Sequence, residues 1–532
     1  MNIKLLTLAT AVALLAIPTT MSAQAPTLGS AADFALFSTN GAVSNTGLSH
    51  LTGNVGTDNG SSTAFGNVDG VMHDQDLASD NAAADLLIAY NQLNAAIPTF
   101  FPAPLLGNGA TFEPGVYFVS GSASLSGTLN LDANNDPNAV FIIQINGAFS
   151  SSAASQVVLV DGALACNVFW KVEGQIELAT NTQMKGNMVA NNAAIILNSG
   201  AQVEGRALTT TGAVTIDGST VRIPLGCGTP ELTGPAAPAL LSVACFTIFS
   251  GNGEVTNSEV TFVTGDVGTN VGLTTGFQQS NVNGTIHPSP DVATAQCAQD
   301  LGTVYSYLNT LPTDIQLLFP AQVGQNLQLT PHTYLLSGAT VLTNTIYLNA
   351  QGNEDAVFVL KINGAFSTST YAKVELMNGA QAKNIFWKID GATDINEYSE
   401  FKGTIIGNNG AVNLASGMQL VGRALTTNGS VLTSGITATM TPGCTTMGIN
   451  DNQATAKAVT FYPNPFSSTL TVNVTAGGNH DLYIYSATGS VIMQKTVSQN
   501  ETTFDTSFPT GIYFYKLIGH DGSIASGKLI SK

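Results

Sequence analysis

The stretch from Glu204 to Ile216, EGRALTTTGAVTI, contains the pattern that decides the fold, and it returns as VGRALTTNGSVLT from Val421 to Thr433. In both places a short apolar run ends at a glycine, and a second short apolar run follows. Glycine turns the backbone without the steric clash that a side chain would cause. The stretch therefore predicts short strands separated by tight corners, at two distant places in the chain.

The repetition covers most of the chain. LTGNVGT, which starts at Leu51, returns as VTGDVGT from Val263, and NVFWKV, which starts at Asn167, returns as NIFWKI from Asn384. Repetition of this length indicates two homologous domains. The segment GTPELTGPAAPA between the copies contains several prolines and is typical of a linker.

Each copy also has a shorter period, marked by the small residue that closes each apolar run. These residues are 26, 27, 19 and 19 positions apart in both copies, and they are Gly121, Gly147, Gly174, Ala193 and Gly212, then Gly338, Gly364, Gly391, Gly410 and Gly429. Large apolar residues lie four positions before each mark, and we expect Trp170 and Trp387 among them in the core. Strands recurring about every 19 residues are typical of stacked parallel coils. We therefore predict a mainly β protein with two parallel β-helix (β-solenoid) domains.

Two segments interrupt this pattern with helical spacing. In Asp74–Pro98, residues Ala84, Leu87 and Ile88 recur at helical intervals before a proline, and a counterpart runs from Asp291 to Pro312. We expect one long amphipathic α-helix alongside each β-helix. Residues 458–532 instead alternate aromatic or β-branched residues with polar ones, which predicts a small antiparallel β-sandwich.

The N-terminus is typical of an exported protein. An early lysine precedes an apolar run from Leu5 to Ile17, and small residues follow at Ala23 and Ala25, which predicts a signal peptide. The run is shorter than the about 20 residues that span a bilayer, so we expect no transmembrane segment. The predicted segments are a signal peptide at 1–25, a first β-helix domain at 26–228, a linker at 229–239, a second β-helix domain at 240–446, a linker at 447–457 and a C-terminal domain at 458–532.

The charge of the chain limits its partners. It has only 16 lysines and arginines and a formal net charge of -18. Because nucleic-acid binding depends on neutralising phosphates with basic residues, we expect no nucleic-acid partner and no anionic membrane surface.

Comparing the two copies screens the candidate catalytic residues, because a catalytic group used by both domains should occur in both copies. Asp161, for example, aligns with Asn378. The carboxylates that both copies share are Glu173 with Asp390 and Glu177 with Asp394. No triad, phosphate loop or metal-spaced cluster accompanies them, so we expect no enzyme activity, no cofactor and no metal site.

Two further residue types recur in both copies. Arg206 and Arg423 follow glycines at coil corners, where we expect their guanidinium groups to bond backbone carbonyls. His73 and His287 precede the helical segments. A single histidine per domain supplies too few ligands for a metal, so we expect capping or packing roles.

The remaining feature is the surface of the coils. A residue type that recurs once per coil forms a straight row with a spacing of about 4.8 Å. Rows of short hydroxyl and amide side chains would hold bridging water on a level wall. By spacing alone, the same rows would serve equally well to satisfy and solubilise a solenoid.

Several motifs together decide between these two alternatives. ADFALFSTNGAVSNTGLSHLTGNVGT, NVFWKV and GRALTTTGAVTID followed by LGC resemble the DUF3494 family of bacterial and fungal ice-binding proteins. The resemblance implies a discontinuous right-handed β-helix with a helix alongside. It also implies adsorption to ice through one flat face, thermal hysteresis and inhibition of ice recrystallisation.

The family often carries a T-A/G-x-T/N pattern on its ice-binding face, and DGST at Asp217–Thr220 and SGIT at Ser434–Thr437 match it loosely. The candidate ice-binding residues are Thr209, Thr211, Thr215, Asn192, Ser199, Ser219, Thr220, Asn146, Ser150, Thr426, Asn428, Asn409, Ser416, Ser434 and Thr437. The alternative function is a cell-surface adhesin that binds an extracellular polysaccharide, and such a protein would expose aromatic platforms.

The C-terminal segment has its own resemblance. YPNP at Tyr462–Pro465, YSATGSVI and TGIYFYKLI are similar to the sorting domain of type IX secretion. This implies a partner in the type IX machinery and a protein that is secreted or attached to the outer surface. Two ice-binding domains on one monomeric chain would raise avidity if both faces reach one crystal.

The five cysteines lie in a chain expected to reach an oxidising compartment. We expect Cys166 to pair with Cys227 and close the first domain. In the second copy Lys383 replaces the first of these cysteines, which leaves Cys245, Cys297 and Cys444. Our first expectation is a link between Cys245 and Cys297.

Overall fold

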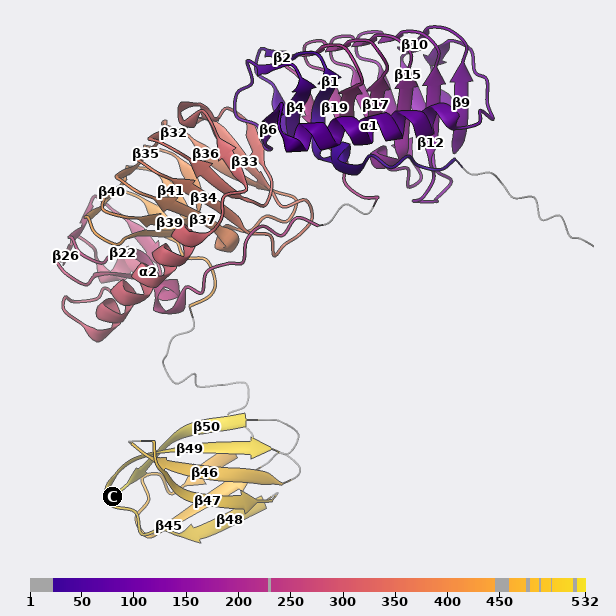
Figure 1. The fold of residues 1–532 in the computed structure, drawn as a ribbon. Helices are drawn as coiled ribbons and strands as arrows, with labels where there is room; N and C mark the ends of the chain where they lie inside the picture. Colours follow the sequence, from indigo (N-terminus) through magenta and orange to yellow (C-terminus); the bar gives the residue numbers. More distant parts are fainter. Residues whose placement is uncertain are drawn as a thin grey trace, which may run out of the picture. The chain divides into compact units, whose positions relative to one another are not determined.

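The computed structural model describes residues 23–227, 231–444, 459–474, 479–487, 489–498, 500–519 and 524–532. Most of the predicted signal peptide, part of the first linker and all of the second linker lie outside these residues. The chain forms two compact units, Met1–Pro442 and Gly443–Lys532, and the first unit contains two repeat domains (Figure 1). None of the helices in the described ranges is long and apolar enough to cross a membrane.

The first repeat domain contains two sheets of parallel strands. Its eight-stranded sheet has the order β5 (Ser62–Thr63), β2 (Val43–Thr46), β20 (Val214–Asp217), β18 (Ile195–Leu197), β16 (Ile176–Leu178), β13 (Phe149–Ser151), β10 (Ala123–Ser126) and β7 (Leu105–Gly107). Its 13-stranded sheet contains β6 (Met72–Asp74), β4 (Asn54–Asn59), β1 (Phe34–Asn40), β19 (Gln202–Thr209), β17 (Gln183–Ala190), β14 (Gln156–Val160), β11 (Thr128–Asp132), β8 (Ala110–Phe112), β12 (Phe141–Ile145), β15 (Val168–Val172), β9 (Gly115–Val119), β21 (Thr220–Arg222) and β3 (His50–Thr52).

The second repeat domain has the same two sheets. Its eight-stranded sheet has the order β26 (Thr274–Thr275), β23 (Val255–Ser258), β42 (Val431–Ser434), β40 (Val412–Leu414), β38 (Thr393–Ile395), β35 (Phe366–Thr368), β32 (Thr340–Thr343) and β29 (Val323–Gly324). Its 14-stranded sheet contains β27 (Val282–Asn283), β24 (Phe262–Thr264), β43 (Thr437–Thr439), β41 (Gln419–Thr426), β39 (Glu400–Gly407), β37 (Ile385–Ile389), β34 (Phe358–Ile362), β31 (Thr333–Leu336), β28 (Ile315–Leu317), β22 (Phe246–Ser250), β25 (Asp266–Thr269), β30 (Leu327–Leu329), β33 (Thr345–Asn349) and β36 (Lys373–Met377).

Each strand pairs in parallel with the corresponding strand of a neighbouring coil. On the eight-stranded sheet Ile176 lies opposite Ile195, and Ile195 lies opposite Val214, so the register repeats the 19-residue spacing of the sequence. One exception changes the order of the stack. β1 and β2, from the start of the domain, pair with β19 and β20 near its end.

The core follows the inward register that the spacing predicts. Trp170 and Trp387 are fully buried. The indole nitrogen of Trp170 donates to the carbonyl oxygen of Lys185 at 2.9 Å, which satisfies its polar atom inside the apolar core.

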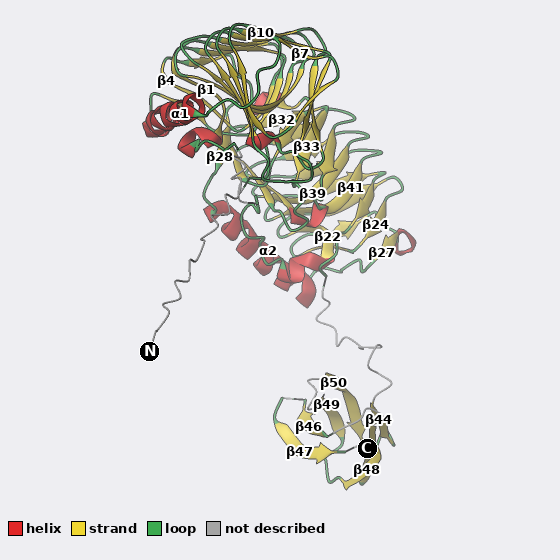
Figure 2. Ribbon diagram, turned by 90° about the vertical axis from the view of Figure 1, so that its right-hand side faces the viewer, coloured by secondary structure: helices red, strands yellow, loops and turns green. Residues whose placement is uncertain are grey.

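One long helix lies along each domain, as predicted (Figures 1 and 2). The helices are α1 (Leu77–Ala95) and α2 (Val292–Thr310). Each begins at a capping box, formed by Asp76 with Ser79 in the first domain and by Asp291 with Thr294 in the second.

The buried face of α1 differs from the face that the sequence suggested. Leu86 and Leu93 are buried against Phe169 on the sheet, whereas Leu87 and Ile88 are exposed. The expectation failed because small alanines, rather than the largest residues, occupy much of the contact between helix and sheet.

The disulfides confirm one expectation and correct another. Cys166 and Cys227 form a disulfide, with Cα atoms 6.1 Å apart. The expected Cys245–Cys297 link is wrong, because Cys297 is buried and free. Cys245 and Cys444 are both disulfide-bonded, and with five cysteines in the chain each is the other's only remaining partner. Cys297 lies on the buried face of α2, within the apolar cluster between helix and sheet.

The C-terminal unit is built from antiparallel strands. One sheet contains β44 (Val459–Tyr462), β45 (Thr469–Val474) and β48 (Asn500–Asp505), and the other contains β47 (Val491–Val497), β46 (His480–Ser486), β49 (Gly511–Gly519) and β50 (Ile524–Ser531). Apolar residues from both sheets, including Leu470 and Leu482, form one core cluster.

Candidate functional site

The eight-stranded sheet of the first domain presents one row of outward side chains. On β20, Val214 and Ile216 point inward and are buried, while Thr215 between them faces outward. We call the in-register set the outer row, and its members are Thr63, Ser44, Thr215, Ile196, Glu177, Ser150, Ser124 and Leu105.

A second row lies at the corner where each strand of this sheet begins. Its members, which we call the corner row, each precede the small residue at the corner, and they are Asn59, Asn40, Thr211, Asn192, Glu173, Asn146 and Ser120. Asn59 donates to the side-chain oxygen of Asn40 at 3.1 Å. The corners stack closely, because a Cβ atom on Gly41 would lie 2.3 Å from the carbonyl oxygen of Gly212. This close approach explains why glycine and alanine recur in the repeated stretch.

The second domain repeats both rows with different residues. Its outer row contains Thr275, Thr256, Leu432, Asn413, Asp394, Ser367 and Val341. In its corner row, Asn252 donates to Asn428 at 3.0 Å and Asn428 donates to Asn409 at 3.1 Å. Adjacent coils are therefore linked by a ladder of asparagine side chains.

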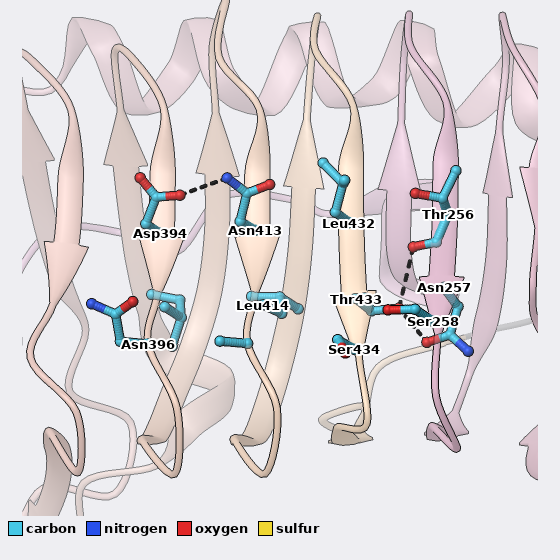
Figure 3. A pocket seen from close by; sticks show the side chains of 12 residues that line it. Thr256, Asn257, Ser258, Asp394, Asn396, Asn413, Leu414, Leu432, Thr433 and Ser434 are labelled. Atoms are coloured by element: carbon cyan, nitrogen blue, oxygen red, sulfur yellow. Dashed lines mark hydrogen bonds between the residues drawn. The ribbon is translucent and has the colours of Figure 1, made fainter.

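A shallow groove runs over the second domain's outer row (Figure 3). Asp394, Asn413, Leu432 and Thr256 follow one another across its neighbouring strands. Asn413 donates to Asp394 at 2.5 Å, so this carboxylate is already engaged by a neighbour within the row.

The candidate residues from the sequence fall in several places on the coils. Those in the corner rows are Asn146, Asn192, Thr211, Asn409 and Asn428, and those in the outer row are Ser150 and Thr215. Ser199, Ser416 and Ser434 lie at the opposite corner, where the chain leaves the eight-stranded sheet. Thr220 and Thr437 lie on a third side, beside Gln202 and Gln419.

Three candidates are buried, and their prediction as surface residues is wrong. Thr209, Thr426 and Ser219 each have no exposed surface. Their hydroxyls donate to carbonyl oxygens, Thr209 to Ala193 at 2.7 Å and Thr426 to Gly410 at 2.9 Å. Each threonine occupies the last inward position of its strand and satisfies a corner carbonyl, so it cannot contact an external surface.

The structure adds four residues to the two rows that were not predicted from the sequence. Ser44 and Thr63 complete the outer row, and Asn40 and Asn59 complete the corner row, all from the first strands of the domain. A usable signal was present, since NGAVS from Asn40 has the same pattern as TGAVT from Thr211.

The carboxylates shared by both copies include a pair that attaches the helices. Glu173 accepts from the hydroxyl of Tyr90 on α1 at 2.7 Å and from Asn191 at 2.8 Å, and it pairs with Lys171. Burial acts to raise the pKa of Glu173, but these hydrogen bonds outweigh it and lower the pKa. Asp390 accepts from Tyr305 on α2 at 2.8 Å in the same way. In each domain the shared carboxylate therefore attaches the helix to the β-sheet, which is a structural role.

The recurring arginines and histidines also have structural partners. Arg206 donates to the carbonyl oxygen of Ala32 at 2.7 Å, and Arg423 donates to that of Ala244 at 2.6 Å. His73 and His287 each lie 2.7 Å from the aspartate that caps the following helix. Within the described ranges, no group of three or more His, Cys, Asp or Glu residues is arranged to hold a metal ion.

Charge distinguishes the sides of the coils. The third side carries ion pairs, including Lys185 with Glu204 at 2.7 Å and Lys402 with Glu375 at 2.9 Å. By contrast, the two rows across the described strands β5, β2, β20 and β18 hold no charged side chain, and their residues are Asn59, Asn40, Thr211, Asn192, Thr63, Ser44, Thr215 and Ile196. These two uncharged rows are the candidate site, and the charged residue beside them on β20 is Asp217, which accepts from the hydroxyl of Thr46 at 2.9 Å.

Comparisons with known proteins agree with the repeat. A family model described as ice-binding-like matches residues 37–222 and 249–439, and one described as a secretion system C-terminal sorting domain matches residues 460–532. An ice-binding protein of Nostoc sp. (strain HG1) is 39% identical over 194 residues, which is 36% of this chain and 71% of that protein. An ice-binding protein of Colwellia sp. is 33% identical over 215 residues, which is 37% of this chain and 83% of that protein.

A solved structure extends the similarity over both repeat domains. The crystal structure of an ice binding protein from an Antarctic bacterium of the Flavobacteriaceae is 66% identical, with a TM-score of 0.78, and covers 79% of this chain and 100% of that one. A score this high over both domains requires them to have similar relative positions in the two structures.

Proposed function

Because the chain belongs to the ice-binding-like family, we propose that it adsorbs to ice crystals through the eight-stranded sheets of its two repeat domains, giving thermal hysteresis and inhibition of ice recrystallisation. The observation that carries this proposal is the pair of uncharged rows over β5, β2, β20 and β18. The similar proteins from Nostoc and Colwellia are ice-binding proteins, which supports this proposal.

The physical basis is the regular spacing of the coils. Neighbouring strands lie about 4.8 Å apart, so side chains recur at a fixed interval along both rows, and across β5 to β18 all of them except Ile196 carry a hydroxyl or amide group. Such groups hold bridging waters at a small entropic cost, and the alanines between the rows leave the surface level. Charged groups would bind water in their own geometry, which is why the third side with its ion pairs is the poorer candidate.

The detailed architecture supports a flat binding surface. We infer that each repeat domain is a discontinuous right-handed β-solenoid and that the C-terminal unit is a β-sandwich. Parallel pairing at intervals of one coil and the shared core of the two antiparallel sheets support these assignments. The domain limits that we propose remain 26–228, 240–446 and 458–532.

The C-terminal sorting domain implies type IX secretion to the cell surface or the extracellular space. We infer that a signal peptide at 1–25 directs the first export step. In this proposal the chain acts as a monomer without a cofactor and is not an enzyme. Its ligand is a crystal surface, for which a flat wall is better suited than a catalytic cleft.

Thermal hysteresis and recrystallisation of ice in the presence of the purified full chain test the proposal. We expect faceted crystals, a gap between melting and freezing temperatures, and arrest of grain growth. Ice that grows without change at saturating protein concentration would contradict ice adsorption.

One observation favours polysaccharide binding as a second candidate. The aromatics that follow the coil spacing are buried, but Tyr371 and Tyr398 in the second domain are exposed, and their rings stack with centroids 5.2 Å apart. The first copy has Ala154 and Asn181 at the aligned positions. Pull-down with insoluble polysaccharides tests this function, with the double variant Tyr371→Ala and Tyr398→Ala as the control.

A further inference from the structure

The contact between the two repeat domains places polar groups of one domain inside the end of the other. Asp69, before β6, is only 3% exposed, although it belongs to a loop of the first domain. Its carboxylate accepts hydrogen bonds from two hydroxyls of the second domain, those of Tyr334 and Thr330, the latter at 2.8 Å. Nearby, Asn67 donates to the carbonyl oxygen of Phe319 at 2.9 Å and accepts from its amide at 3.0 Å. We call this set of contacts the joint.

A carboxyl group buried in an interface requires hydrogen-bond donors from its surroundings. Removing it from water is unfavourable unless hydrogen bonds replace the lost hydration. At the joint the replacement donors come from the other domain, so Asp69 is satisfied only when the two ends are in contact. The carboxyl therefore selects one docked arrangement.

The residues of the joint differ between the copies. Asp69 aligns with Asn283, which is exposed at the free end of the second domain, and Thr330 aligns with Glu113. Asn67 and Tyr334 recur in the other copy as Asn281 and Tyr117, so the pair Asp69 and Thr330 is what only one combination of ends provides. The duplication preserved the coils, but their ends differ at the positions of Asp69 and Thr330.

The corresponding end of the first domain is closed by its own residues. Tyr117, the counterpart of Tyr334, donates to the carbonyl oxygen of Glu113 at 2.7 Å. Its ring stacks on Phe112 at 4.0 Å and on Phe100 at 4.6 Å. A Cβ atom on Gly115 would lie 2.6 Å from the Phe100 ring, so glycine is needed for this closure. The position of Gly115 holds His332 in the second copy.

From these differences we propose that the joint is a one-way interface, in which Asp69 and Asn67 recognise only the end of the second domain formed by Phe319, Thr330 and Tyr334. It holds the two repeat domains as one rigid body. The outer ends carry Asn283 in place of Asp69 and Glu113 in place of Thr330, so the contact stops at two domains instead of continuing from molecule to molecule, which is the hazard of end-to-end contacts in stacked repeats. This proposal does not depend on binding to ice.

Hydrogen exchange on the full chain tests the joint directly. The Phe319 amide should exchange slowly in the wild type because it donates to Asn67. In Asp69→Ala we expect its exchange to accelerate by at least about tenfold as the joint opens, while amides of the eight-stranded sheets stay protected. Asn283→Ala, at the aligned position of the free end, is the matched control and should leave the Phe319 amide unchanged.

A second variant approaches the joint from the other domain. Thr330→Val removes one donor to Asp69 without altering the first domain, and it should accelerate Phe319 exchange and lengthen the particle in small-angle X-ray scattering. Equal Phe319 exchange in the wild type and both joint variants would overturn the proposal. An Asn283→Ala effect as large as that of Asp69→Ala would also overturn it, because the contact would then not be specific to one end.

Discussion

Thr215 on β20 lies directly opposite Ser44 on β2, and their hydroxyl oxygens are 3.5 Å apart although 171 positions separate them in the chain. This pairing places β2, from the start of the domain, directly beside β20, from its end. The outer row is therefore continuous across strands that no local pattern connects. The uncharged rows lie across these strands, from β5 to β18.

The first prediction follows from this pairing. Thr215→Tyr and Ser44→Tyr should each lower thermal hysteresis several-fold, because a ring at either position raises an obstacle above the level rows. Thr220→Tyr, on the third side, is the matched control and should retain activity. Circular dichroism checks that all three variants are folded. Full activity in both row variants would remove this sheet as the ice-binding face.

The buried threonines allow a separate prediction about stability. Thr209→Val should lower the free energy of unfolding by about 1–3 kcal/mol, because the carbonyl oxygen of Ala193 loses its donor inside the corner. Thr426→Val should behave similarly in the second domain. Chemical denaturation measures the change. Hysteresis per folded molecule should be unaffected, and a selective loss of activity without loss of stability would return these residues to the binding face.

The joint should depend on pH through Asp69. Burial raises the pKa of this carboxyl, against smaller opposing effects of His332, Tyr334 and Thr330. A carboxyl whose pKa is higher in the docked state holds its proton more tightly there. Docking is therefore most favourable below the ordinary carboxyl pKa and weakens as the pH rises through the raised value.

Melting of the wild type and of Asp69→Asn over a pH series measures this dependence. Asp33, Asp314 and His332 line the same cavity as Asp69. Because the wild type and Asp69→Asn share these three groups, their titration cancels when the stabilities of the two proteins are subtracted. We expect the wild type to lose stability relative to Asp69→Asn as the pH rises. A difference that stays constant from about pH 4 to pH 8 would contradict the prediction.

The cysteines give a chemical test of the fold. A maleimide reagent should label no thiol in the native chain and one thiol, Cys297, after denaturation without reductant, because Cys297 is buried. Burial also raises the pKa of this thiol, which further lowers its reactivity. Cys245→Ser should release Cys444 as a second labelled site. A single labelled thiol in denatured Cys245→Ser would contradict the Cys245–Cys444 pair.

Local properties of the chain could be predicted from the sequence. The 19-residue spacing identified the coils, and the strand alternation placed Trp170 and Trp387 inside. Both follow from short-range physics, because side chains alternate along a strand and only small residues fit where corners stack. The likeness of the two copies likewise indicated Arg206 and His73 as structural residues.

Other features were decided only by the tertiary structure. Alternation places Thr209 next to the corner, but whether its hydroxyl faces water or a carbonyl depends on the neighbouring coil. The partner of Cys245, the docking of Asp69 and the position of Ser44 beside Thr215 all join residues that are distant in the chain. The spacing of the coils and the inward or outward direction of a side chain are local properties of the sequence. Which strands and which domain ends come into contact depends on how the whole stack closes, and no short stretch of sequence contains that information.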